Sequence, residues 1–392
     1  MTVENPAPLR LRPLIPLATL SLSVGIAGAL VIPFLSLFLT DGLHAGPVQL
    51  GAFLLVVQIA TVIVSTVLAR VSDSRDIRRT LLLAGAAAGT CSYVLYAVVR
   101  DYWTLLLVAC TLVPVASSLF PQLFAYARQS LQRTGSAKVP QIIGNLRMLI
   151  SLAWVAGPPI GAALIGVGGF ATLFGVAAVL YGAVGLSVIR LPDVGKADKT
   201  ATVSDEAAAP PRGNVALSFV AFGLMAAASS LGTSALPLFV TYDLHGSTGD
   251  AGLIFGLCAA LEIPIMIGFS YLTGKTDLHR LVLAGLVVAL AYHGVMALTT
   301  SPWQIAAAQL LNATVIASVM GVGISYFQLL APDRPGHATT LYANTNTVGA
   351  MLAGPLLGVA AKFGYRNAYL MTLGMVVAAV ALMVITRPRR TV

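Results

Sequence analysis

The chain has 392 residues, of which 57% are hydrophobic and only 9% are charged, and its formal net charge is +9. Soluble domains carry about 25% charged residues, and a mean hydropathy of +0.88 leaves too little polar surface to cover one buried core. The composition therefore excludes an ordinary soluble protein and makes the lipid bilayer the expected solvent. Lys and Arg are scattered in short loops, which gives no reason to expect nucleic acid as a partner.

Twelve apolar runs follow one another along the chain, and each has about the 20 residues that a membrane-spanning helix needs. The first run follows Arg10 and Arg12, as in a signal peptide, but it is longer than a signal-peptide core of about 7–15 residues, so we expect an uncleaved span. The expected fold class is an all-α membrane protein with twelve transmembrane helices. The predicted spans are 14–40, 48–70, 80–99, 102–127, 139–165, 169–190, 214–241, 250–273, 281–300, 302–330, 338–361 and 365–386.

The connections between the spans are short, except for the one between the sixth span and the seventh. Residues 191–213 carry several charges together with Pro210 and Pro211, so this segment is predicted to be a flexible linker. The linker separates an expected N-terminal six-helix bundle, residues 1–190, from an expected C-terminal six-helix bundle, residues 214–392.

Loop charges orient the spans. With the N-terminus in the cytoplasm, nineteen Lys and Arg residues fall on the cytoplasmic side, and three, Arg100, Lys362 and Arg366, fall outside. Cytoplasmic loops of membrane proteins carry an excess of these residues. We therefore expect both termini to be cytoplasmic and the number of spans to be even.

The two halves resemble each other at an offset near 201 residues. Three matched pairs occur in the same order in each half: Phe38-Leu-Thr-Asp-Gly-Leu-His44 with Phe239-Val-Thr-Tyr-Asp-Leu-His245, residues 76–85 with residues 277–285, and Ala156-Gly-Pro-Pro-Ile-Gly161 with Ala353-Gly-Pro-Leu-Leu-Gly358. Two parallel six-helix repeats joined by a linker resemble the major facilitator superfamily. In that fold the solute site lies between the repeats near the bilayer midplane, and rocking of the halves gives alternating access.

The loop between the second and third spans carries a further resemblance. Residues 69–79, Ala-Arg-Val-Ser-Asp-Ser-Arg-Asp-Ile-Arg-Arg, resemble the signature loop of the superfamily but depart from it at the first, sixth and eighth positions. The resemblance implies a gating role for the acid and the arginines that follow it, with the acid facing the end of the fourth span. The alternative to a gating role is that these charges only fix the topology. The residues concerned are Asp73, Arg78, Arg79 and Arg128.

The fifth span carries Ala156-Gly-Pro-Pro-Ile-Gly-Ala162, which resembles the Gly-Pro-x-x-Gly-Gly element of superfamily exporters, with Ala162 in place of the last glycine. Gly and Pro let helices approach closely and bend. Gly157 and Pro158 are therefore candidate gating residues, and an ordinary packing kink is the alternative.

Short sequences along nearly the whole chain are similar to those of the bacterial sugar efflux transporter family. The resemblance implies export of small sugars or glycosides, driven by protons, across the bacterial cytoplasmic (inner) membrane by a chain that is expected to be a monomer. The similar sequences are Pro33-Phe-Leu-Ser-Leu-Phe-Leu39, Pro121-Gln-Leu-Phe-Ala125 with Arg128, Arg147 with Ser151-Leu-Ala-Trp154, Leu261-Glu-Ile-Pro264, Gln309-Leu-Leu-Asn312, and Ala338-Thr-Thr-Leu341 with Asn344.

Two charged residues lie deep inside predicted spans, Arg147 in the fifth and Glu262 in the eighth. Their positions in the sequence put both roughly 12–18 Å from an interface. Charged groups at this depth are costly, face a bundle interior or a water-filled cavity, and are functional by default. Glu262 can take up and lose a proton, which makes it the expected proton-coupling residue, whereas arginine stays charged and is expected to bind solute hydroxyl groups.

Neutral hydrogen-bonding side chains are also frequent inside the spans. Amides both donate and accept, which suits a polyhydroxylated solute, and an indole ring can stack on a sugar face. Hydrogen bonds that only join helices are an equally good interpretation of each amide taken alone. The expected solute-binding residues, besides Arg147, are Gln58, Gln122, Asn145, Trp154, Gln309, Asn312 and Asn344.

The sequence also bears on three other kinds of function. Export of hydrophobic drugs is the alternative within the superfamily, and the many amides oppose it. An enzyme would need a catalytic set such as His-Glu-x-x-His or Gly-x-Ser-x-Gly, and the sequence has neither. A receptor or scaffold would usually add a soluble domain. We therefore expect no enzymatic activity, no metal site and no cofactor other than a proton gradient.

Overall fold

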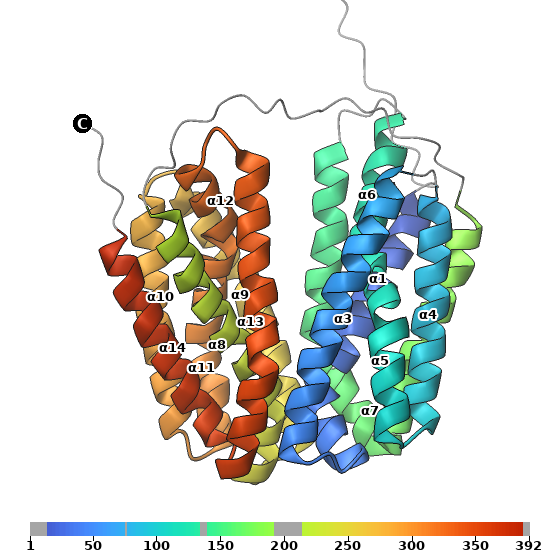
Figure 1. Cartoon of the computed structure of the whole chain (residues 1–392), viewed down its shortest axis with the longest axis horizontal. Helices are drawn as coiled ribbons and strands as arrows, with labels where there is room; N and C mark the ends of the chain where they lie inside the picture. Colours follow the sequence, from blue (N-terminus) through green and yellow to red (C-terminus); the bar gives the residue numbers. More distant parts are fainter. Residues whose placement is uncertain (1–13, 75–76, 134–138, 192–213, 387–392) are drawn as a thin grey trace, which may run out of the picture.

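The computed structural model describes residues 14–74, 77–133, 139–191 and 214–386. Within these ranges every regular element is helical, and the helices form two bundles that lie side by side (Figure 1). The expected linker 191–213 lies outside the described residues, except for Leu191.

The first bundle contains the helices up to α7. Four short segments from Leu14 to Gly42 follow one another without a break and make one pass, and α5 and α6 meet at Ser118 to make another. The elements are α1 (Leu14–Val31), η1 (Ile32–Phe34), α2 (Leu35–Leu37), η2 (Phe38–Gly42), α3 (Pro47–Ser74), α4 (Arg78–Val98), α5 (Tyr102–Ser117), α6 (Leu119–Arg133) and α7 (Val139–Ile189).

The second bundle repeats this order. Its first pass again ends in a π-helical segment, and α11, η4 and α12 follow one another to make a single pass. The elements are α8 (Val215–Leu238), η3 (Phe239–Asp243), α9 (Thr248–Thr273), α10 (Leu278–Leu298), α11 (Pro302–Val315), η4 (Ile316–Met320), α12 (Gly321–Leu330), α13 (Pro335–Phe363) and α14 (Arg366–Ile385).

The passes match the predicted spans in number and order. Among the described residues, 10 helical stretches are long and apolar enough to cross a membrane. One of them, α7, is two passes, because Gly168 and Gly169 interrupt it with non-helical dihedral angles, Gly169 at φ +68°. A further pass is α13, which is long enough but carries the polar run 344–347. The described chain therefore holds the twelve passes that the sequence predicts.

The internal repeat is confirmed in backbone detail. The π-helical segments η2 and η3 lie 201 residues apart, and each is followed by a histidine with a left-handed backbone, His44 at φ 50° and His245 at φ 53°. The same turn geometry therefore ends the first pass of each bundle, as the matching sequences predict.

Polar side chains cap helix starts that lie in the loops. Asp101 begins α5 by accepting hydrogen bonds from the backbone N–H and the hydroxyl of Thr104, both at 2.7 Å, and these bonds lower the pKa of its carboxyl group. Ser247 and Asp250 form a capping box at the start of α9. These caps satisfy backbone donors at the points where the helices emerge from lipid.

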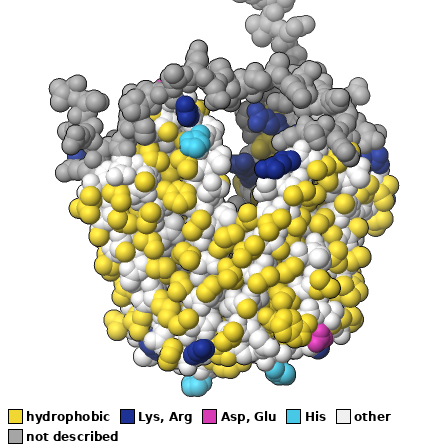
Figure 2. Space-filling model, viewed as in Figure 1, with side chains coloured by type: hydrophobic (Ala, Val, Ile, Leu, Met, Phe, Trp, Pro, Cys, Tyr) yellow, Lys and Arg dark blue, Asp and Glu magenta, His cyan; other side chains and the backbone are white. Residues whose placement is uncertain are grey.

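The two bundles meet at one end of the molecule and separate at the other. They are in contact at the end where α3 and α9 begin, which we call the closed end, and they diverge toward the end where α3 finishes and α10 begins, which we call the open end (Figure 1). Figure 2 shows that the surface is hollowed between the bundles at the open end and that Lys and Arg side chains gather around the opening.

The packing of apolar side chains follows the same division. One buried cluster joins both bundles at the closed end and includes Phe38 and Phe53 of the first bundle and Phe239 and Tyr369 of the second. Two further clusters each stay within one bundle, around Tyr126 and around Tyr326. Each bundle therefore has its own core, and the shared cluster is the part that must come apart if the closed end opens.

Candidate functional site

The arginines of the signature loop hold the open end of the first bundle together. Arg78 donates to the backbone carbonyl of Ala125 in α6 at 3.3 Å, and Arg79 donates to the backbone carbonyl of Ile189 at the end of α7 at 2.8 Å. Ile189 is the last residue of α7, where a cation interacts favourably with the helix dipole, whereas Ala125 lies in the middle of α6. The two contacts connect the start of α4 to α6 and to the end of α7.

The other expected gating residues at this end are only partly placed. The side chain of Asp73 lies outside the described residues, so the expected contact between Asp73 and Arg128 remains a prediction. Arg128 is exposed near the end of α6. In the second bundle, His279 lies 201 residues after Arg78 and contacts the hydroxyl of Tyr326 at 3.1 Å, so an intra-bundle contact is repeated there.

At the closed end, α7 and α9 pack at very short range. A Cβ atom on Gly252 would lie 2.7 Å from the carbonyl oxygen of Pro158 and 2.7 Å from the Cβ of Ala162, which no real side chain could occupy. Gly157, on the other side of α7, packs against Ala29 of α1, where an added Cβ would lie 2.4 Å from the Cβ of Ala29. The glycine-proline element therefore joins the bundles on one side and its own bundle on the other.

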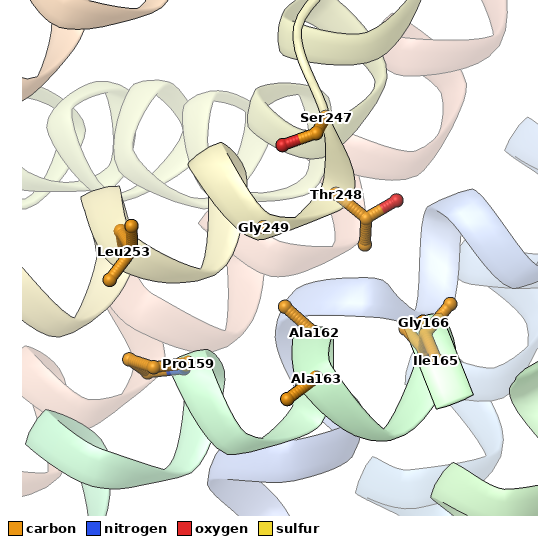
Figure 3. A pocket seen from close by; sticks show the side chains of 9 residues that line it. All are labelled: Pro159, Ala162, Ala163, Ile165, Gly166, Ser247, Thr248, Gly249 and Leu253. Atoms are coloured by element: carbon orange, nitrogen blue, oxygen red, sulfur yellow. The ribbon is translucent and has the colours of Figure 1, made fainter. Parts of the chain in front are cut away.

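Small residues line a groove beside this contact. Figure 3 shows Pro159, Ala162 and Gly166 of α7 lying opposite Thr248 and Gly249 of α9. The groove has a volume of about 580 Å³. Small side chains on both walls leave room for the two helices to move against each other.

The repeat-related pair α3 and α13 makes an equivalent contact. A Cβ on Gly358 would lie 2.7 Å from the carbonyl oxygen of Pro47, and one on Gly354 would lie 3.0 Å from the carbonyl oxygen of Gly51. Gly51 and Gly252 lie 201 residues apart. Gly354 contacts the other bundle, whereas Gly157, which it matches in the glycine-proline element, packs within its own. The closed end is thus sealed by two symmetry-related helix pairs with glycine at each contact.

Hydrogen bonds also cross between the bundles at the closed end. The hydroxyl of Ser36 donates to the backbone carbonyl of Ser234 at 2.6 Å, and the hydroxyl of Tyr242 donates to the carboxylate of Asp41. Asp41 and Tyr242 lie 201 residues apart, so this bond joins equivalent positions of the two repeats. Asp41 and Tyr242 lie in the matched repeat sequences 38–44 and 239–245, but those sequences alone do not show that the two side chains bond to each other.

In the second bundle the structure brings three of the expected site residues together. Asn312 donates from Nδ2 to the Oε1 of Gln309 at 3.0 Å and lies 3.4 Å from the Sγ of Cys258. Glu262 follows Cys258 by one turn of α9 and is half-buried. It lies 14 residues after Thr248 and 11 before Thr273, which places it about 16–21 Å from the helix ends.

Arg147 and Glu262 do not pair with each other. Arg147 is exposed on α7, and its guanidinium carbon lies 5.5 Å from the centre of the Phe124 ring. No ion pair joins these two described side chains in the conformation with an open hollow. An arginine at this depth requires a water-filled surrounding, which agrees with a position beside the space between the bundles.

The remaining expected solute-binding residues are spread over both bundles. Gln122 is buried and accepts a hydrogen bond from the hydroxyl of Ser72 at 3.0 Å, so it joins α6 to α3 in this conformation. Gln58 and Trp154 are half-buried, on α3 and α7, and Asn145 and Asn344 are exposed, on α7 and α13. Among the described side chains, no hydrogen bond joins any of these five residues to the Gln309–Asn312 pair.

Four polar side chains that sequence reasoning did not select lie behind this amide pair. Tyr292 and His293 are buried and line the same pocket as Gln309, and His293 is 1% exposed. Ser229 and Thr233 of α8 line the same pocket. The sequence feature that could have pointed to them is the histidine within a span, because an ionisable group is costly there and marks a functional site by default.

Comparisons with known proteins agree with this fold. The model of the Major Facilitator Superfamily matches residues 17–352 and 217–392. Sugar efflux transporter B of Salmonella typhimurium is 38% identical over 356 residues, which are 90% of each chain. Sugar efflux transporter A of Dickeya chrysanthemi is 34% identical over 361 residues, which are 92% of each chain.

Solved structures show the same architecture. The nucleoside transporter NupG has a TM-score of 0.77 at 16% identity and covers 96% of this chain and 99% of its own. A POT family transporter in complex with 5-aminolevulinic acid has a TM-score of 0.76 at 11% identity and covers 96% of both chains. The fold and the family match define a multi-pass membrane transporter of the major facilitator superfamily. Within that superfamily, the chain belongs to the bacterial sugar efflux transporter family.

Proposed function

We propose that this chain exports small sugars or glycosides in exchange for protons by alternating access. Three relatives that are 38%, 34% and 35% identical over nearly the whole chain are named sugar efflux transporters. The observation that carries the proposal is the amide pair Gln309–Asn312, whose Asn312 contacts Cys258, the residue one helical turn before Glu262 on α9. Amides suit sugar hydroxyl groups, and a carboxyl group suits a proton.

The two ends of the molecule support alternating access. The surface is hollowed between the bundles at the open end, while the glycine contacts and the bond between Tyr242 and Asp41 join the bundles at the closed end. Separate apolar cores let each bundle move as one body. Rocking would break the shared cluster at the closed end and bring the bundles together at the open end.

The charge distribution supports a cytoplasmic position for the open end. Arg78, Arg79, Arg280 and Arg334 lie at helix starts on this end, and cytoplasmic ends of membrane proteins are rich in Lys and Arg. In this orientation the structure faces inward, ready to take solute from the cytoplasm. Both termini would then be cytoplasmic as well.

Glu262 gives the exchange a physical basis. In an antiport cycle the carboxyl group takes a proton from the outside and releases it to the cytoplasm, while the sugar crosses in the opposite direction. The two ligands then bind alternately, because the carboxylate form accepts hydrogen bonds from sugar hydroxyl groups and the protonated form cannot accept as many. Binding of the proton thereby favours release of the sugar, and binding of the sugar favours release of the proton.

Flux measurements in proteoliposomes test the proposal. Labelled glucosides, galactosides and a lipophilic dye are compared under an imposed pH gradient. We expect gradient-driven accumulation of at least one sugar and none of the dye. Accumulation of the dye alone would assign the chain to the hydrophobic-solute exporters, and movement of neither, in folded protein, would overturn the proposal.

A further inference from the structure

A polar recess enters the wall of the C-terminal bundle between α8, α10 and α11. The centre of a water molecule can reach about 40 Å³ of it. On this measure one water needs about 10–15 Å³, so the recess has room for about three waters or a small chemical group, but not for a sugar ring. Its polar lining consists of Ser229, Thr233, Tyr292, His293, Gln309 and Asn312.

His293 gives this recess an unsatisfied hydrogen-bonding atom. The side chain is 1% exposed, and its Nδ1 atom is buried without a hydrogen-bond partner among the described residues. Buried polar atoms in native proteins are nearly always paired, so each exception calls for a ligand or a water molecule. The recess is polar and large enough to supply that partner.

The two amide groups of the recess are already held in place. Gln309 donates from Nε2 to the carbonyl of Ile305 at 3.1 Å and accepts from Asn312 at 3.0 Å. These bonds fix the amide groups before any ligand arrives. A ligand group that enters the recess therefore meets oriented partners and loses little affinity to their ordering.

The matching positions of the first bundle carry different side chains. Trp103 and Trp303 lie 200 residues apart and are both 69% exposed, which sets the register of this part of the repeat. At that offset, Tyr93 replaces His293, and its ring packs 5.3 Å from Tyr181 and 6.2 Å from Phe174, measured between centroids. Gln309 and Asn312 are replaced by apolar residues, Ala109 and Leu112.

The fold thus does not require these polar side chains, since the repeat carries a tyrosine ring and two apolar side chains at the positions that match His293, Gln309 and Asn312. We propose that the recess binds the hydroxymethyl arm of the transported sugar, with His293 and Gln309 as its hydrogen-bond partners and the sugar ring outside, between the bundles. This inference rests on the proposed sugar export and adds which part of the sugar is recognised.

The charges around the recess agree with a neutral ligand group. The titratable side chains close to the recess are Tyr292, which lines it beside His293, Tyr369, whose ring lies beside Gly232, and Cys258, which contacts Asn312. Glu262 follows Cys258 by one turn of α9. Tyr369 is already engaged, because its hydroxyl donates to the backbone carbonyl of Gly232 at 3.1 Å. A hydroxyl group both donates and accepts, so it can satisfy either tautomer of the imidazole.

Binding of paired sugars tests the inference. Methyl glucoside and methyl galactoside are each compared with the 6-deoxy analogue, using purified full-length protein in lipid nanodiscs. We expect the wild-type protein to bind the hydroxymethyl form of at least one pair about tenfold more tightly, because the analogue leaves buried polar groups unpaired. His293→Leu should reduce that ratio to about one by weakening only the hydroxymethyl form, and His293→Asn should restore part of it.

Two further variants keep the test independent of folding. Thr233→Val has nearly the same volume and removes one hydroxyl of the recess, so it should lower the ratio even if His293→Leu fails to fold. His279→Asn changes a buried histidine of the same helix that already has Tyr326 as its partner, and it should leave the ratio unchanged.

The outcomes separate the two proposals. Sugars that bind without discrimination against the 6-deoxy analogues, or with discrimination that survives in both folded recess variants, would overturn the recess while leaving sugar export intact. Folded wild-type protein that binds no sugar of either series would overturn both.

Discussion

Glu262 lies midway along α9, half-buried, one turn from Cys258 and the amide pair that Cys258 contacts. We predict that Glu262→Gln, which resembles the protonated side chain in volume, abolishes accumulation driven by a pH gradient. Sugar binding should stay within about tenfold of wild type, because the amides remain. Proteoliposome flux and equilibrium binding on the same preparation measure the two properties.

Exchange of labelled for unlabelled sugar provides the control for this substitution. It needs the alternating-access motion but no net proton movement, so it should persist in Glu262→Gln. A variant that still accumulates sugar against its gradient with protons as the only driving force would remove Glu262 from the coupling mechanism.

At the scale of single residues, the sequence predicts the acidic side of the site better than the recess behind it. Glu262 stands out because a carboxyl group is rare deep in a span, and Gln309 and Asn312 stand out because amides three residues apart share a helix face. His293 is missed because a single histidine among apolar residues looks like core packing. Only the three-dimensional positions show that its Nδ1 lacks a partner and that a cavity lies beside it.

At the scale of helices, the contact between α7 and α9 determines whether the closed end can close. We predict that Gly252→Val favours the conformation in which this end is open, because the added Cβ would lie 2.7 Å from the Pro158 carbonyl oxygen. Overpacking of this kind costs about 1–3 kcal/mol, which corresponds to a population shift of about 5- to 150-fold.

Spin labels on Trp103→Cys and Trp303→Cys, exposed equivalent positions at the closed end, measure this shift by their distance distribution. Gly268→Val on the same helix is the matched control, because a Cβ there would meet nothing within 4 Å. Equal distance distributions for the two valine variants would contradict a role of the α7–α9 contact in closing this end.

The hydrogen bond between Tyr242 and Asp41 gives a milder prediction at the same scale. Tyr242→Phe removes only the hydroxyl that donates across the bundles. The loss of one such bond costs about 0.5–1.5 kcal/mol. The population of molecules whose bundles have separated at the closed end should therefore rise about 2- to 10-fold. The same pair of spin labels measures this change. An unchanged distance distribution would contradict the prediction, because it would mean that water replaces the bond at no cost in free energy.

Helix positions follow from the sequence closely, because an apolar run of membrane length has few other ways to satisfy its backbone. The predicted spans overlap the observed passes throughout the described residues. The π-helical segments η2, η3 and η4 were not predicted, since their residues are as apolar as the helices around them. Contacts between bundles, such as Gly51 with Gly354, depend on the conformation, and one sequence encodes more than one conformation.

For the whole molecule, the charge asymmetry makes a prediction about orientation. A cysteine at Ser247, on the closed end, should react with a membrane-impermeant maleimide from outside intact cells, and a cysteine at Thr276, on the open end, should not. Both positions are exposed. Reaction at Thr276 alone would mean that the chain is inserted with the opposite orientation.

Proton movement driven by a sugar gradient tests the central claim most directly. Proteoliposomes with a pH-sensitive dye inside and no other gradient receive an external sugar that the transporter carries. Exchange of sugar for protons predicts that the lumen becomes alkaline in the wild-type protein and stays unchanged in Glu262→Gln. Sugar influx that leaves the internal pH of wild-type vesicles unchanged, or acidifies it, would contradict sugar–proton exchange.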